Sequence, residues 1–155
     1  MNSENASEKL SEHFTLTEAT RTETGLPNDP GEYEKENLKR LCNELLEPIR
    51  SLLGVVIIPN SMFRCTEVNR RVGGAKNSAH LEGRACDFRP GNGMDIMQAF
   101  GLIRISLIDY DKLIIEHKSG SWWIHVQIAR KGNKARRLAY RAELKGDEMV
   151  YTPVK

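Results

Sequence analysis

A long amphipathic helix is the feature of this sequence that most constrains the fold. From Glu32 to Leu53, apolar residues recur every three or four positions with charged residues between them, as on one face of a helix. These apolar residues are Leu38, Leu41, Leu45, Ile49 and Leu52. Pro48 lacks a backbone N–H, so it should kink this helix or begin a second helical segment. Gly54 is expected to end it.

The rest of the chain predicts short helices, short strands and a late hairpin. Strands are expected at residues 55–59 and near 148–151, helices at 66–72 and from 94 to about 107, and a hairpin over 112–128. This order predicts a single α+β domain in which helices pack on an antiparallel sheet. We expect residues 1–13 to be a flexible N-terminus and residues 14–155 to form the domain.

The composition is that of one globular domain. The chain has 155 residues and a net charge of +2, which by itself is too small to indicate nucleic acid or a membrane as partner. No apolar run approaches the length of a membrane span, and the polar N-terminus has no signal-peptide pattern. Cys42, Cys65 and Cys86 are irregularly spaced, which argues against a disulfide framework and favours synthesis in a reducing compartment.

The stretch NSAHLEGRACDFRP, residues 77–90, places His80 and Asp87 close together. A hydrolytic zinc site needs about three ligands from His, Cys and carboxylates, with one position left open for water. His125, flanked by apolar residues in a predicted strand, is the best candidate for the third ligand. On spacing alone the alternative stays open that His80 caps a turn, Asp87 ends a strand and His125 is a hydrogen-bonded sheet residue.

Longer motifs carry a resemblance to a known family. The segments SMFRCTEVNRRVGGAKNSAHLEGRACDF and YDKLIIEHKSGSWWIHVQI resemble the zinc D-alanyl-D-alanine carboxypeptidase-like peptidases. The pattern Ser-x-His-x-x-Gly-x-Ala-x-Asp is met by Ser78, His80, Gly83, Ala85 and Asp87, and a downstream Trp-x-His by Trp123 and His125. The resemblance covers roughly residues 14–128 and implies one zinc ion held by His80, Asp87 and His125, in a fold shared with the hedgehog signalling domain.

The resemblance also implies a function. The family includes cell-wall carboxypeptidases, vancomycin-resistance D,D-dipeptidases and phage endolysins, so we expect a monomeric peptidase that cleaves peptidoglycan stem peptides. D,D-carboxypeptidase and L-Ala-D-Glu-type endopeptidase activity both remain open. No nucleic-acid partner and no stable membrane association are expected. Without a signal peptide the enzyme is made in the cytoplasm, and release through a phage holin would bring it to the cell wall.

Other residues are assigned roles next to the zinc ligands. Arg64 matches the family arginine near the substrate, where a guanidinium can bind a carboxylate or a carbonyl that acquires negative charge. Ser78 matches a serine that contacts substrate, although a turn hydroxyl is an equally simple reading. Trp122 and Trp123 point to opposite faces of their strand, and we expect Trp123 to line the substrate cleft.

The general base is where this chain departs from many relatives, which place a carboxylate three residues before the last histidine. Here that position is Trp122, and Glu116 is the proposed substitute. A hairpin that turns at residues 119–120 pairs Glu116 with Trp123, which puts Glu116 diagonal to His125 on the same face of the sheet.

Residues 130–145 form a basic segment, with seven lysines and arginines against one glutamate. A solvated surface is its simplest reading, and attraction to anionic cell-wall polymer is the functional one. Two other functions stay open: a non-catalytic, zinc-stabilised binding or virion component with the same fold, and a nucleic-acid-binding protein that uses this segment. The second is less favoured, because Tyr140 is the segment's one aromatic residue.

Overall fold

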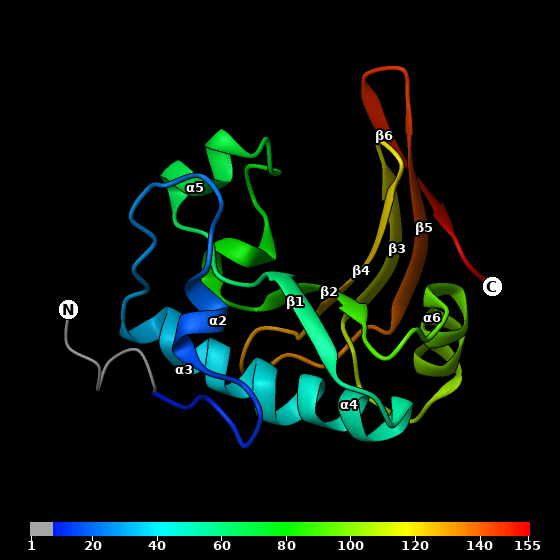
Figure 1. The fold of residues 1–155 in the computed structure, drawn as a ribbon, viewed down its shortest axis with the longest axis horizontal. Helices are drawn as coiled ribbons and strands as arrows, with labels where there is room; N and C mark the ends of the chain where they lie inside the picture. The colour runs from blue at the N-terminus through cyan, green and yellow to red at the C-terminus, as the bar shows by residue number, and fades with distance from the viewer. Residues whose placement is uncertain (1–7) are drawn as a thin grey trace.

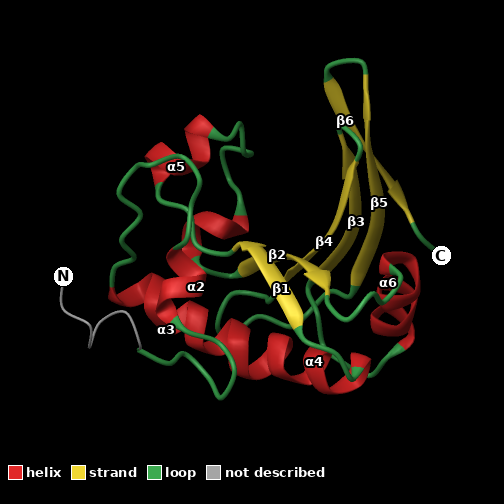
Figure 2. Ribbon diagram, viewed as in Figure 1, coloured by secondary structure: helices red, strands yellow, loops and turns green. Residues whose placement is uncertain are grey.

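The computed structural model describes residues 8–155, which form one sheet with helices packed against it. The helices are α2 (Leu16–Thr20), α3 (Glu32–Leu41), the π-helix η1 (Cys42–Leu46), α4 (Glu47–Leu53), α5 (Thr66–Arg71), the 3-10 helix η2 (Ala79–Glu82) and α6 (Ile96–Ile105). The strands are β1 (Ile57–Ser61), β2 (Ala85–Pro90), β3 (Lys112–Lys118), β4 (Ser121–Gln127), β5 (Leu138–Lys145) and β6 (Glu148–Pro153). The predicted α+β class is confirmed (Figure 2).

The six strands lie in the order β1-β2-β4-β3-β5-β6. All neighbouring pairs are antiparallel except β3 and β5, which run parallel and were not expected to do so. The chain explains this exception, because β4 ends beside the start of β3. Residues 128–137 then cross past that end of the sheet, so β5 begins where β3 begins.

The long predicted helix is present, and Pro48 does begin a second segment. Pro48 lies in the first turn of α4, directly after the π-helical turn. In that turn the Glu47 N–H donates to the Cys42 carbonyl, five residues earlier. The wider turn shifts the phase of the helix face, so Leu53 is buried at its end and the expected Leu52 is 41% exposed.

Helices cover one face of the sheet and leave the other for the site. Alternate residues of the central strands, among them Cys86, Phe88, Ile115 and Ile124, are buried with the apolar side of α3, η1 and α4 in one core. In Figure 1, α3 and α4 run below the sheet, while β3 to β6 rise opposite α5 and its neighbouring loops. The residues that alternate with these core positions therefore point to the other face of the sheet, toward α5 and its neighbouring loops.

The segment before α2 packs more closely than expected. Leu10 is buried in the core, and Ser11 Oγ donates to Glu47 Oε2 at 2.6 Å. Thr15 caps α2 in a capping box with Glu18. Residues 8–13 thus belong to the folded domain and not to a flexible N-terminus, because an apolar side chain gains free energy by burial. Residues 1–7 of that expected segment lie outside the described residues.

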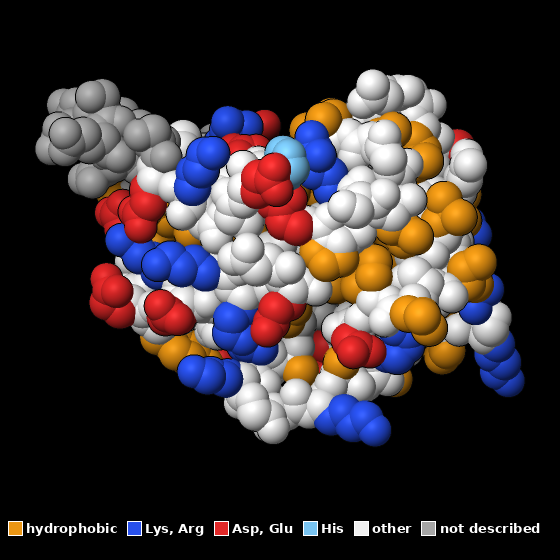
Figure 3. Space-filling view, turned by 90° about the horizontal axis from the view of Figure 1, so that it is seen from below, with side chains coloured by type: hydrophobic (Ala, Val, Ile, Leu, Met, Phe, Trp, Pro, Cys, Tyr) orange, Lys and Arg blue, Asp and Glu red, His pale blue; other side chains and the backbone are white. Residues whose placement is uncertain are grey.

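The lower surface combines charged and apolar areas. Figure 3 shows lysine, arginine and acidic side chains interspersed on one side of this face and apolar side chains gathered on the other. Exposed apolar residues of α4, α6 and the loop after it include Leu52, Ile105 and Leu107. In residues 8–155, no helix is long and apolar enough to cross a membrane.

Gly83 fixes the turn from η2 into β2, and we predict that Gly83→Ala destabilises the protein. Gly83 has φ of +74°, and an added Cβ would lie 2.6 Å from the Glu34 carbonyl oxygen. Left-handed strain and this backbone clash together should lower the free energy of unfolding by about 2–4 kcal/mol. Gly93→Ala is the matched control, because Gly93 has φ of +72° with nothing within 4 Å of the added atom. Denaturant unfolding should show the smaller loss for Gly93→Ala, and equal losses would remove the clash from the explanation.

Candidate metal centre

The strand register brings the predicted site residues together on one face of the sheet. Asp87 of β2 lies opposite His125 of β4, and Glu116 of β3 lies opposite Trp123 of β4. The hairpin register predicted from the turn at residues 119–120 is therefore confirmed. Side chains two residues apart share a face, so His125, Trp123 and Glu116 all point away from the core formed with α3, η1 and α4.

Three of these side chains form a compact buried cluster. His80, Asp87 and His125 each offer one ligand atom, and the three atoms lie within 4.8 Å of one another. Asp87 Oδ1 lies 3.2 Å from His80 Nε2 and 2.9 Å from His125 Nδ1. This group, drawn from η2, β2 and β4, could hold a metal ion, and one carboxylate with two imidazoles is a donor set that zinc accepts.

His80 is oriented by its own turn and by the segment before α5. Ser78 caps η2, and its hydroxyl oxygen accepts from the backbone N–H of His80 at 3.2 Å. His80 Nδ1 lies 2.6 Å from the Met62 carbonyl oxygen, which can only accept, so Nδ1 carries the proton. Nε2, beside Asp87, is then the nitrogen whose lone pair is available to a metal ion, which is the arrangement a ligating histidine needs.

His125 faces Asp87 with a different ring nitrogen from the one that His80 uses. Its Nδ1 faces Asp87, and its Nε2 lies 2.9 Å from the side-chain oxygen of Gln127. Both histidines thus combine one nitrogen at the cluster with one that has a hydrogen-bond acceptor, so the three residues fit a metal ion.

Burial and mutual charge set the protonation of the cluster. Burial alone would raise the pKa of Asp87, but the two imidazoles outweigh it and hold the pKa of this carboxyl well below its usual range. Burial lowers the pKa of His80 despite the nearby Asp87. Burial would also lower the pKa of His125, but the hydrogen bond and charge of Asp87 outweigh it and raise that pKa. Ionised carboxylate and neutral imidazole are the forms that bind metal, and a bound cation would favour both.

The pKa of Glu116 is shifted in the opposite direction from the pKa of Asp87. Burial, and next the negative charge of Asp87, raise the pKa of Glu116 to about 7. The positive charges of His125 and Arg64 oppose this rise. A nearby metal ion would act in the same direction as these groups and favour the carboxylate. Such a partly buried carboxyl beside a candidate metal site has the properties of a general base.

Arg64 contacts Asp87 at Oδ2, whereas the two histidines lie at Oδ1. Its Nη2 donates to Asp87 Oδ2 at 3.2 Å, its Nη1 to Asn69 Oδ1 at 3.2 Å and its Nε to Ser61 Oγ at 3.0 Å. A Cβ on Gly74 would lie 2.0 Å from Asn69 Oδ1 and 2.9 Å from Arg64 Nη1. The second glycine of the Gly-Gly pair therefore makes room for this contact, a role that the sequence did not reveal.

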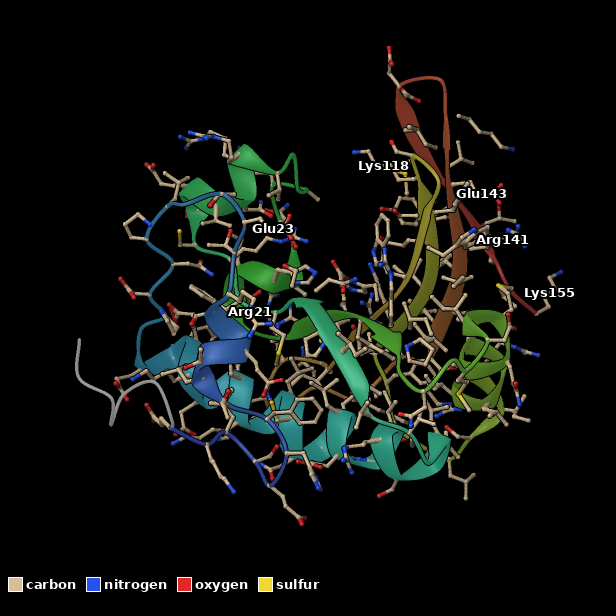
Figure 4. All side chains as sticks on the ribbon, in the orientation of Figure 1. Arg21, Glu23, Lys118, Arg141, Glu143 and Lys155 are labelled. Carbon is tan, nitrogen blue, oxygen red and sulfur yellow. The ribbon has the colours of Figure 1, made fainter. Side chains whose placement is uncertain are left out.

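The cluster opens into a cleft of about 1050 Å³. Arg64, Ser78, Glu116 and Trp123, the residues predicted from the sequence, all line it. Figure 4 shows Arg141 and Glu143 on the opposite side of the strands, away from the cleft. The cysteines take no part in it: Cys42 and Cys86 are buried in the core and Cys65 is partly exposed.

The strands after residue 127 supply residues that sequence reasoning missed. Tyr140, Met149 and Tyr151 of β5 and β6 line the cleft. Tyr151 lies opposite Ala142, and Ala142 lies opposite Glu116, so all three share one row across the sheet. Side-chain alternation along β5 indicates only weakly that Tyr140 faces the cleft. Nothing in the local sequence indicates that β5 pairs with β3.

Comparison with known proteins agrees with this geometry. A family model described as Peptidase M15 matches residues 10–127. The match includes η2, β2 and the β3–β4 hairpin, and with them all three residues of the cluster. A search of curated proteins finds no match. With a family match over most of its length and the His80, Asp87 and His125 cluster inside the matched region, the chain belongs to the peptidase M15 family.

Proposed function

We propose that this protein is a zinc-dependent hydrolase of peptide bonds in peptidoglycan stem peptides. The observation that carries the proposal is the meeting of the His80, Asp87 and His125 cluster with partly buried Glu116 in one cleft. A structural metal site would need its ligands but no adjacent base of raised pKa.

His80, Asp87 and His125 would hold one zinc ion at the base of the cleft. When bound, zinc supplies Lewis acidity, which polarises the scissile carbonyl and acidifies water. Glu116 removes a proton from the attacking water and passes it to the leaving amine. Burial raises the pKa of Glu116 to about 7, which suits a group that both takes up and releases a proton.

Arg64 and the walls of the cleft bind the substrate. Arg64 stabilises the negative charge that develops on the carbonyl oxygen, or a carboxylate of the peptide. Trp123 and Ser78 line the cleft near this position, although the Ser78 hydroxyl also caps η2. Six further basic residues line it, and their charge suits the carboxylates of stem peptides. These are Arg84, Lys112, Lys118, Arg130, Lys134 and Arg136.

The cell-wall role is a further part of the proposal. A D,D-carboxypeptidase and an L-Ala-D-Glu-type endopeptidase would both use this machinery. We propose a monomeric phage or prophage endolysin, without nucleic-acid or stable membrane partners, that reaches the wall after holin-mediated release. Mass spectrometry of peptidoglycan fragments after digestion identifies the bond. Zinc binding without release of any fragment would instead support a binding or virion component.

The zinc ligands are tested by metal content. His80→Ala, Asp87→Ala and His125→Ala should each weaken zinc binding by more than the roughly 10–100-fold that outer residues contribute, because a three-ligand set has no spare member. His117→Ala is the matched control, since His117 stacks on Trp122 on the opposite face of the hairpin. Zinc content after competition with a chelator measures the effect. Full occupancy in any of the three variants would remove that residue from the ligand set.

The general base is tested by an isosteric change. Glu116→Gln should keep zinc and thermal stability while hydrolysis of murein falls by about 100-fold or more, because an amide cannot take the proton. Glu143→Gln is the control, since Glu143 is a carboxylate of the neighbouring strand that pairs with exposed Arg141. Wild-type turnover in Glu116→Gln would place the base elsewhere.

Arg64 is tested by two changes at one position. Arg64→Ala should retain zinc and lose most of the activity, and Arg64→Lys should restore only part of it, because an ammonium cannot reproduce the planar set of donors. Murein hydrolysis and zinc content are measured on the same samples. Near-normal turnover in Arg64→Ala would exclude a role in the reaction.

A further inference from the structure

A chain of hydrogen bonds leads away from His125 on the side opposite Asp87. His125 Nε2 lies 2.9 Å from Gln127 Oε1, and Gln127 Nε2 donates to Asp111 Oδ2 at 3.1 Å. Arg136 donates from Nη2 to the same Asp111 oxygen at 2.8 Å, and from Nε and its backbone N–H to Oδ1 at 2.9 and 3.2 Å. Gln127 and Asp111 are 7% and 3% exposed, so water competes little for these bonds.

The chemistry of these groups gives the chain a direction. The guanidinium of Arg136 can only donate, so both Asp111 oxygens act as acceptors and the carboxyl is held ionised. An ionised carboxylate cannot donate, so the Gln127 amide must turn its NH₂ group toward Asp111. Its oxygen is then left facing His125, where it can only accept. His125 Nε2 must therefore carry a proton, and Nδ1, beside Asp87, is the nitrogen left to give its lone pair to a metal ion.

Such a chain is needed at His125 but not at His80. The Met62 backbone carbonyl that faces His80 Nδ1 has one possible role, that of acceptor. A glutamine side chain is different, because rotation of the amide by 180° exchanges its donor and its acceptor. Without a group that fixes the amide, Gln127 would accept either tautomer of His125.

We propose that Gln127, Asp111 and Arg136 are positioning residues that hold His125 with its proton on Nε2, so that Nδ1 is the nitrogen offered to the metal. The inference rests on the proposed zinc site and adds the reason why its third ligand has a defined orientation. Arg136 lies beyond the residues matched by the family model, in the loop between β4 and β5. The ligand geometry of the matched region thus depends on a residue outside it.

Zinc affinity of the full chain, measured by competition with a chelator, tests the proposal without an activity assay. Gln127→Leu removes the hydrogen bonds at similar volume and should weaken zinc binding by about 10–100-fold. Gln98→Leu is the matched control, because Gln98 is exposed on α6, and should bind zinc like the wild type. Thermal unfolding of the metal-free proteins shows whether any loss comes from instability alone.

A second pair of variants tests whether the direction of the hydrogen bonds, and not side-chain packing alone, orients His125. Asp111→Asn should also weaken zinc binding, because the new amide can donate as well as accept and no longer fixes Gln127. Adding Gln127→Glu to Asp111→Asn should restore affinity to within a few fold of the wild type, since the carboxylate then faces His125 and the amide donates to it. Nitrogen-15 NMR of the zinc-loaded wild type should show the His125 proton on Nε2.

The outcomes distinguish this inference from the proposed function. Wild-type zinc affinity in Gln127→Leu, or no recovery in the double variant, would overturn the positioning role. Zinc binding by the wild type with no hydrolysis of murein would overturn the proposed function alone. A wild-type protein that binds no zinc would overturn both.

Discussion

The backbone register of β4 is the constraint on which the site depends. β4 lies between β2 and β3, and its pairing sets Asp87 opposite His125 and Glu116 opposite Trp123. Side chains alternate along a strand, so a slip by one residue would turn His125 into the apolar core. The same slip would bring Ile124, which is fully buried, to the cleft. The core residues of β4 thus maintain the register that the site requires.

The second constraint is electrostatic. Asp87 is buried, and an isolated carboxylate there would cost several kcal/mol of desolvation. Two imidazoles and the guanidinium of Arg64 surround it and keep it ionised. Glu116 shares the cleft but forms no such ion pair with any residue of 8–155, and burial raises its pKa to about 7. Two carboxyl groups on neighbouring strands are in this way separated into a candidate metal ligand and a candidate base.

The last part of the chain completes the site. The residues matched by the family model contain the three candidate ligands, Arg64 and Glu116. The segment that follows adds Tyr140, Met149 and Tyr151 to the wall of the cleft and Arg136 to the hydrogen-bond chain behind His125. The ion pair of Arg136 with Asp111 fixes the loop at the point where β5 begins beside β3. The arginines in the basic segment are therefore not all free surface charges.

The sequence by itself determined the features that depend on local spacing. Apolar periodicity predicted the long helix, and Pro48 predicted that it is divided. The turn at residues 119–120 predicted the register that sets Glu116 diagonal to His125. The motif around His80 and Asp87, together with the resemblance it carries, identified the candidate ligands before any fold was known.

Only the tertiary structure decided what depends on distant segments. A π-helical turn moved the buried position from Leu52 to Leu53, and the packing of Leu10 brought residues 8–13 into the domain. The parallel pairing of β5, the space that Gly74 leaves for Arg64 and the bonds from His125 to Arg136 had no local signal. The physical reason is the range of the interactions: periodicity and turn chemistry act within a few residues, whereas strand order, close approach and hydrogen-bond direction are set by segments that meet only in the folded chain.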